Sequence, residues 1–549
     1  MLTIDARFQG SFRTVGQSPL GLAITRPQHF GHIYLMMLGS TSITALVVVG
    51  ASALIAYWFR PQPSRSRFCS EQDHAARLAH VVEHLSARPP NAKLSLQRRT
   101  LQSNTIRNSG YKDEPVYFPV DLSSFNKIIR INTEEMWVEC EPGILFSDLL
   151  RELLKEGMSP LVVVELPGIT VGGAIAGGGL ESSSFRHGQF NDTVLEMECL
   201  TPNRVVCSPT INIDLFYAIS ASYNTVALLV KVKLRIQHAP KYVNLEIERY
   251  TTAGEVVEAL RSEKGDCLEG IAFANDDYAV VRGRYSDTSI GKVTQFSRHY
   301  DRWYYKSVKD TTTMTVPYWD YCFRYNYGAF WMAEYVLDML GGDTFLTRLL
   351  FGSFLDTTHL FKVLHSSDLT DLGRMRVIQD FYIPRNNVES FINEIDSFVG
   401  VYPLWLCPIK STQTSQQFAC HHSPAGTDLI NVGIYGRPRS FPFNAKEVNN
   451  RLVELLISTG GRSMLYAQNW HTAEQFDKIY DEARRQVDGV KRRYGSDCFY
   501  DFYDKISLKP EERRKLDVPI VGTEMEAQKE IVKNIILSKL GLDRGASKA

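Results

Sequence analysis

The chain has 549 residues, of which 44% are hydrophobic and 22% charged, a composition that excludes a disordered chain, a coiled coil and a collagen-like repeat. Lysine plus arginine and aspartate plus glutamate are equal at 61 each, so no charge excess points to nucleic acid, and no such partner is expected. The nine cysteines are scattered without a CxxC pair, which argues against a disulfide framework and against a metal site. We therefore expect a reduced, intracellular-facing globular body.

An uncharged apolar run, residues 33–59, is the first predicted element. As a helix it would be ~40 Å long, enough to cross the ~30 Å hydrocarbon core with some tilt. Tyr34, Tyr57 and Trp58 at its ends match the aromatic belt of a membrane interface. A cleaved signal peptide and a buried core helix are the alternatives, but the length of the run and of the segment before it favours an anchor. More arginines follow the run than precede it, which weakly places the large body in the cytosol.

Four parts are expected after this N-terminal tail and anchor (residues 1–60). They are a linker with a helix (61–92), a compact α+β domain (93–240), a second, aromatic-rich domain (241–510) and a charged tail with a last helix (511–549). Apolar or alternating runs predict strands at 136–140, 161–165, 194–201, 226–236, 377–383 and 429–435. Amphipathic spacing predicts helices at 71–85, 144–156 and 444–458, and one that begins at Thr523. The predicted fold class is α+β with two domains.

A glycine- and serine-rich stretch, residues 167–188, carries the most chemical information. Glycines this dense let the backbone approach a ligand and point successive N–H groups at an anion, and the serine hydroxyls that follow add donors suited to a pyrophosphate. The stretch is not a Walker loop, because no Gly-Lys-Ser/Thr follows, and it lacks the third glycine and the opening helix of a Rossmann fingerprint. From glycine content alone, a phosphate-binding loop and a flexible turn are equally good interpretations.

The neighbouring motifs decide between these interpretations by resemblance. PGITVGGAIAGGGLESSSFRHG (167–188), with DLFYAIS (214–220) and LLVKVKLRI (228–236), resembles the flavin-binding domain of the delta-24-sterol reductase family, which belongs to the FAD-binding PCMH-type proteins related to vanillyl-alcohol oxidase. The resemblance continues at VYPLWLCP (401–408), GIYGRPR (433–439) and MLYAQNW (464–470), and so covers residues 93–505. The family's N-terminal membrane anchor also matches. The resemblance implies a two-domain PCMH-type fold with an α+β cap domain over the substrate.

The same resemblance implies which residues contact FAD. The flavin is expected to be noncovalent, because the first loop, 103–107, has no histidine to tether it. Arg107 can offer the pyrophosphate a bidentate charged contact. The implied cofactor residues are Asn104, Thr105, Arg107, Pro167, Gly168, Ile169, Thr170, Val171, Gly172, Gly173, Gly177, Gly178, Gly179, Glu181, Ser182, Ser183 and Thr225. One departure concerns the adenine side: relatives read Gly-Thr-Leu-Gly where this chain reads Asn-Thr-Val-Ala at 224–227.

The implied activity is reduction of a carbon–carbon double bond in a lipophilic, sterol- or terpenoid-like substrate, by a membrane-anchored, FAD-dependent enzyme that uses NADPH. The expected location is the endoplasmic reticulum membrane, with the catalytic body in the cytosol. Protonating an unactivated alkene creates carbocation character that aromatic faces stabilise. Tyr435, Tyr466 and Trp470 are the catalytic candidates, with core packing as the alternative for each. An oxygen-using FAD oxidase or dehydrogenase of secondary metabolism, and a flavin-free binding protein, are the other hypotheses.

Overall fold

The computed structural model describes residues 66–97, 105–107, 110–262, 264–366, 375–411, 427–440 and 443–516. The predicted anchor at 33–59, Asn104 and the predicted helix that begins at Thr523 lie outside these ranges. Within them, no helix is both long and apolar enough to cross a bilayer. The chain separates into two compact units, Met1–Pro63 and Ser64–Ala549, and everything described below belongs to the second.

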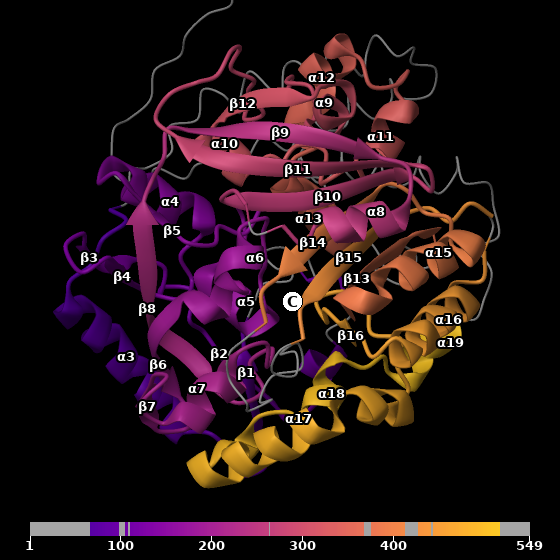
Figure 1. Cartoon of the computed structure of the whole chain (residues 1–549). Helices are drawn as coiled ribbons and strands as arrows, with labels where there is room; N and C mark the ends of the chain where they lie inside the picture. Colours follow the sequence, from indigo (N-terminus) through magenta and orange to yellow (C-terminus); the bar gives the residue numbers. More distant parts are fainter. Residues whose placement is uncertain are drawn as a thin grey trace, which may run out of the picture. The chain divides into compact units, whose positions relative to one another are not determined.

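The first predicted domain is built on a six-stranded antiparallel sheet (Figure 1). Its order is β3 (Ile128–Asn132), β4 (Trp137–Cys140), β8 (Leu228–His238), β6 (Val194–Leu200) and β7 (Arg204–Cys207), with β5 (Met158–Pro160) paired to the end of β8. A parallel pair, β1 (Lys93–Leu96) and β2 (Tyr117–Val120), lies beside it. The helices are α3 (Glu71–Ser86), α4 (Phe146–Lys155), α5 (Val171–Gly177), α6 (Ser184–His187) and α7 (Ile213–Ile219).

Sequence patterns located most of these elements within two residues. The strands expected at 136–140, 194–201 and 226–236 are confirmed as β4, β6 and β8, and the helices expected at 71–85 and 144–156 are confirmed as α3 and α4. The strand expected at 161–165 is wrong. The three valines Val162, Val163 and Val164 are buried, but the segment that pairs with a neighbouring strand is the preceding β5. The apolar run therefore reflects the burial of a loop and not a hydrogen-bonded strand.

The second domain is an eight-stranded antiparallel sheet. In order, its strands are β12 (Thr313–Pro317), β9 (Tyr242–Tyr250), β11 (Asp277–Ser286), β10 (Cys267–Ala274), β14 (Leu404–Ile409), β15 (Leu429–Gly436), β13 (Val377–Pro384) and β16 (Arg462–Ser463). One face packs in a single apolar cluster with α8 (Ala253–Ala259), α15 (Val388–Phe398) and α16 (Ala445–Ser458). β13, β15 and α16 confirm the elements expected at 377–383, 429–435 and 444–458.

The remaining helices fall into two groups. The segment after β11 contributes α9 (Tyr304–Asp310), α10 (Tyr318–Cys322), α11 (Glu334–Asp338), α12 (Phe345–Phe351) and α13 (Thr357–Ser366). The C-terminal group is α17 (Ala473–Tyr494), α18 (Phe502–Ile506) and α19 (Pro510–Leu516). In Figure 1, α12 lies at the top of the molecule and α17 at the bottom.

A buried ion-pair network joins the two domains. Arg324, fully buried, contacts Glu181 of the first domain at 2.6 Å and Glu269 of β10 at 2.8 Å. Tyr304, Tyr325 and Trp405 also donate hydrogen bonds to Glu269. Because removing one partner of a buried pair leaves an uncompensated charge, this network holds the domains in one fixed arrangement.

Candidate active site

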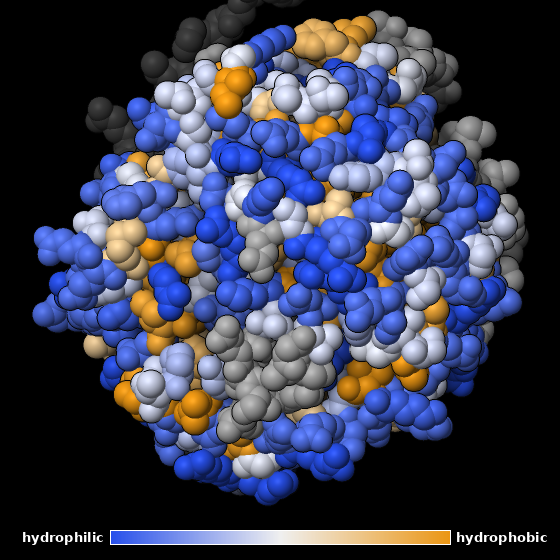
Figure 2. All heavy atoms as spheres, in the orientation of Figure 1, coloured by the Kyte–Doolittle hydropathy of each residue, from blue (hydrophilic) through white to orange (hydrophobic). Residues whose placement is uncertain are grey.

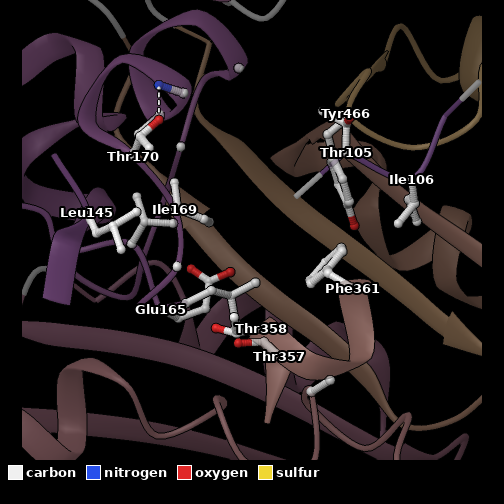
Figure 3. Close-up of a pocket in the computed structure, with 18 of the residues that line it drawn as sticks. Thr105, Ile106, Leu145, Glu165, Ile169, Thr170, Thr357, Thr358, Phe361 and Tyr466 are labelled. Atoms are coloured by element: carbon white, nitrogen blue, oxygen red, sulfur yellow. Dashed lines mark hydrogen bonds between the residues drawn. The ribbon is translucent and has the colours of Figure 1, made fainter. Parts of the chain in front are cut away.

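A cavity of about 780 Å³ is lined by residues of both domains, a size within the ~300–1,000 Å³ range of ligand sites. One part of its wall is formed by the glycine-rich stretch, Arg107 and the turn at Tyr223. Another part is apolar and comes from the second domain: Phe330, Met332, Val336, Met339, Leu360 and Phe361. Figure 3 shows the cavity between these parts, with Thr170 and Ile169 on one side and Tyr466 and Phe361 on the other.

The glycine-rich stretch is not a flexible turn, because it folds into the first turns of α5. Thr170 caps this helix by accepting a hydrogen bond from the N–H of Gly173 at 3.0 Å, drawn in Figure 3. The N–H of Gly172 donates to the carbonyl of Pro142 at 2.8 Å. The expectation that these two N–H groups point at an anion is therefore corrected, since both donate within the protein. A Cβ at Gly172 would lie 2.6 Å from the Pro142 Cβ, so this glycine permits close packing.

Arg107 supplies the charge that an anionic cofactor needs. It lies on the cavity wall with its guanidinium 4.9 Å from the centroid of the Tyr223 ring. Its Nη1 is buried and, within the described part of the chain, has no hydrogen-bond partner. Burial lowers the pKa of this guanidinium. A buried N–H group of a cation without a hydrogen-bond partner is unfavourable, and a phosphate oxygen in the cavity would satisfy Nη1, so the site fits the pyrophosphate of FAD.

The backbone accommodates Asn224, the first residue of the 224–227 segment that departs from the pattern of the family it resembles. Tyr223 and Asn224 both have left-handed conformations, with φ of 50° and 59°. Asparagine tolerates this region better than other side chains, which explains how Asn224 stands where relatives carry glycine. The buried ammonium of Lys505 donates to the carbonyls of Tyr223 at 2.8 Å and Asn224 at 3.1 Å, and so holds the turn.

The structure brings together only part of the predicted cofactor set. On the cavity wall lie Thr105, Arg107, Gly168, Ile169, Thr170, Gly172, Gly173, Gly177 and Gly179. Not on this wall are Pro167, Val171, Gly178, Glu181, Ser182, Ser183 and Thr225.

The hydroxyls expected to contact the cofactor make hydrogen bonds inside the protein. Ser182 donates to Glu181, whose carboxylate also pairs with Arg324. Ser183 donates to the carbonyl of Leu161, and Thr225 to that of Ser222.

Two of the three catalytic candidates meet at one buried carboxyl. Tyr435 and Tyr466 line the cavity and donate to the two oxygens of Asp380, at 2.6 and 2.7 Å. Burial raises the pKa of Asp380, and the hydrogen bonds from Asn431 and the two tyrosines oppose that rise. Trp470 is not on the cavity wall, because it packs with Ala445, Val453 and Leu508 in a separate cluster.

Glu165 is the functional candidate that sequence reasoning missed. Its carboxyl lies on the cavity wall, and Figure 3 shows it between Ile169 and Thr358. Its Oε2 is buried with no hydrogen-bond partner among the residues that the structure describes. Burial, assisted by the nearby charge of Glu181, raises the pKa of this carboxyl well above its usual range. An acid at the end of a buried apolar run was the signal that could have identified it.

Residues 91–207 match the family described as FAD binding domain. The Delta(24)-sterol reductase of Homo sapiens is 28% identical over 396 residues, covering 69% of this chain and 76% of that protein. The Delta(24)-sterol reductase homolog of Caenorhabditis elegans is 28% identical over 473 residues, covering 79% and 87%. Cytokinin dehydrogenase 10 of Oryza sativa is 31% identical over 229 residues, covering 37% and 41%.

The matched domain and the cavity define an FAD-dependent oxidoreductase. Over most of its length the chain is similar to delta-24-sterol reductases, and residues 91–207 carry their FAD-binding type of domain.

Replacing Arg107 by methionine tests the cofactor site. Methionine keeps a flexible chain against Tyr223 but removes the charge, and hydrogen bonds to charged groups contribute ~1.5–3 kcal/mol each. We expect FAD affinity to fall roughly 10- to 100-fold. Flavin fluorescence titration of the apoprotein measures this, and Arg107→Lys should recover part of the affinity. Unchanged affinity in the methionine variant would place the pyrophosphate elsewhere.

Proposed function

We propose that this protein reduces a carbon–carbon double bond in a lipophilic substrate of the sterol or terpenoid type. The observation that carries the proposal is Glu165, whose buried Oε2 has no hydrogen-bond partner among the described residues and which lies on the wall of a largely apolar cavity. The wall formed by Met332, Val336 and Phe361 suits a hydrocarbon skeleton. The names of the human and nematode relatives support the same reaction class.

In this proposal Arg107 and the cavity wall at 168–179 would hold FAD, whose reduced form, regenerated by the nicotinamide, would supply a hydride. Glu165 supplies the proton, since burial raises its pKa well above the usual range and so favours the acid form. Proton and hydride together add two hydrogens across the double bond. Glu165 is left as a carboxylate, and a proton from solvent restores the acid before the next turnover.

Aromatic rings would stabilise the positive charge that develops on the protonated alkene. The ring of Phe330 lies 5.0 Å from that of Tyr435 and 5.3 Å from that of Trp405, and all three side chains line the cavity. The hydrogen bonds from Tyr435 and Tyr466 to Asp380 fix the orientation of this wall.

We further propose NADPH as the reductant and a single-pass anchor at residues 33–59, in the endoplasmic reticulum membrane with the body in the cytosol. The chain has no Rossmann fingerprint of its own, so the nicotinamide would dock transiently at the flavin. A lipophilic substrate concentrates in the bilayer, and an anchor keeps the cavity close to that supply.

Anaerobic mixing of the purified full chain with NADPH tests this function. We expect the flavin absorbance to bleach and to return when a suitable sterol or triterpene is added, with a product heavier by two hydrogens in mass spectrometry. The second candidate is an oxidase or dehydrogenase, which the match to a cytokinin dehydrogenase favours. Bleaching by the substrate alone, with peroxide formed on admission of air, would support that candidate and contradict the reductase. A preparation without flavin would contradict both.

A further inference from the structure

Helix α12 turns three of its apolar residues toward the outside and its two polar residues toward the inside. Phe345, Leu346 and Leu349 are 60%, 60% and 40% exposed, whereas Thr347 and Arg348 of the same helix are buried. Figure 2 shows apolar side chains at the top of the molecule, where Figure 1 places α12. A surface helix of a water-soluble domain has the opposite arrangement, so this orientation calls for an apolar environment outside the protein.

Specific interactions hold the helix in this orientation. The hydroxyl of Thr347 donates to the carbonyl of Gly342 at 2.8 Å. The guanidinium of Arg348 pairs with Asp343 and donates to the carbonyl of Tyr300 at 3.2 Å. Asp343 also pairs with Lys306 of α9 at 2.8 Å. Rotating the helix to bury Phe345 and Leu346 would break these contacts and expose a charge-paired interior.

The helix lies in the chain between the two segments that form the apolar end of the cavity. Val336 and Met339 line the cavity just before α12, and Thr357 and Phe361 line it just after. The apolar outer face of α12 and the apolar cavity wall therefore belong to one continuous insertion of the second domain.

We propose that the apolar face of α12 docks on a lipid bilayer. Two further observations favour lipid over another occupant. The same chain carries an uncharged run at 33–59 that is long enough to span a membrane. Tyr300 lies next to Phe345, with ring centroids 6.1 Å apart, and so adds an aromatic ring of the kind typical of a membrane interface. The exposed Arg298 lies over Tyr300 and pairs with Asp301 at 2.8 Å, so this edge is polar and carries both charges.

Docking places the apolar end of the cavity beside the membrane. A lipophilic substrate could then pass from the bilayer to the cavity without crossing water. This consequence rests on the proposed function, whereas the docking itself does not.

Fluorescence quenching by lipid tests the docking directly. The full chain carrying Phe345→Trp is reconstituted into phosphatidylcholine vesicles whose acyl chains are brominated near the headgroup. The emission that the new tryptophan adds to that of the parent chain should fall by roughly half or more relative to unbrominated vesicles, because docked side chains enter ~5–10 Å into the boundary region. The matched control is Ile211→Trp, an apolar residue that is 52% exposed just before α7. Figure 1 shows α7 in the lower part of the molecule, far from α12. The emission added by the tryptophan at position 211 should therefore not be quenched.

The proposal would be overturned if the tryptophans at positions 345 and 211 were quenched equally, or if neither of them was quenched. So would concentration-dependent dimerisation that Leu346→Glu abolishes, which would assign the face to a second copy. Quenching at Phe345→Trp that appears only after removal of residues 517–549 would assign the face to the chain's own tail and would likewise overturn it. None of these readouts requires activity, so a failed reductase assay and a failed docking assay are distinguishable.

Discussion

Replacing Glu165 by glutamine is expected to lower kcat by roughly 10²- to 10⁴-fold, the usual contribution of a positioned general acid. Glutamine preserves the shape of the side chain on the cavity wall but has no proton to transfer. FAD content and thermal stability should stay close to those of the parent, because no hydrogen bond of Oε2 within the described structure is lost. Single-turnover oxidation of the reduced flavin by substrate measures the chemical step.

The pH dependence separates acid catalysis from a structural effect. The raised pKa of Glu165 means that the acid form persists above the range in which an ordinary glutamate ionises. The rate should therefore be constant across that range and fall only as the pH rises through the raised pKa. This fall should disappear in Glu165→Gln. The control Glu134→Gln, an exposed turn residue, should leave rate and profile unchanged. A glutamine variant with the parent rate would remove Glu165 from the mechanism.

Replacing Gly177 by valine is expected to release FAD from a protein that stays folded. Gly177 ends α5 on the cavity wall, and an added Cβ would meet only Tyr223 Cε1, at an ordinary 3.9 Å. The branched side chain would therefore occupy cavity space rather than clash with the protein. We expect a colourless preparation whose apoprotein unfolds at the temperature of the parent apoprotein.

The control for this variant is Gly489→Val. Gly489 lies inside α17, also a helix, and an added Cβ there has nothing within 4 Å. Both substitutions place valine at a helical glycine, so they share the change in helix propensity and differ in access to the cavity. The Gly489 variant should keep its flavin. Stoichiometric FAD in a folded Gly177 variant would show that the cofactor does not approach the end of α5.

Local sequence patterns predicted most of the helices and strands, and the ordered motifs revealed the similarity to delta-24-sterol reductases. α3, α4 and α16 were predictable because side chains three and four residues apart share one helix face, and β8 and β15 because apolar runs of strand length reflect burial in a sheet. The resemblance predicted Arg107, Thr170 and Gly177 as cofactor contacts, and the structure places all three on the cavity wall.

The tertiary structure decided which side chains from distant segments meet. It also decided which polar groups form their hydrogen bonds within the protein. Asp380 gathers Tyr435 and Tyr466 from different segments, and Trp470 of the same motif as Tyr466 packs elsewhere. The hydroxyl of Ser182 donates to a neighbouring carboxylate, which no spacing rule predicts. The role proposed for Glu165 depends on a buried Oε2 with no hydrogen-bond partner within the described structure, and the exposed apolar face of α12 depends on pairing with Asp343. These features follow from long-range packing and desolvation, which act between residues that the sequence separates.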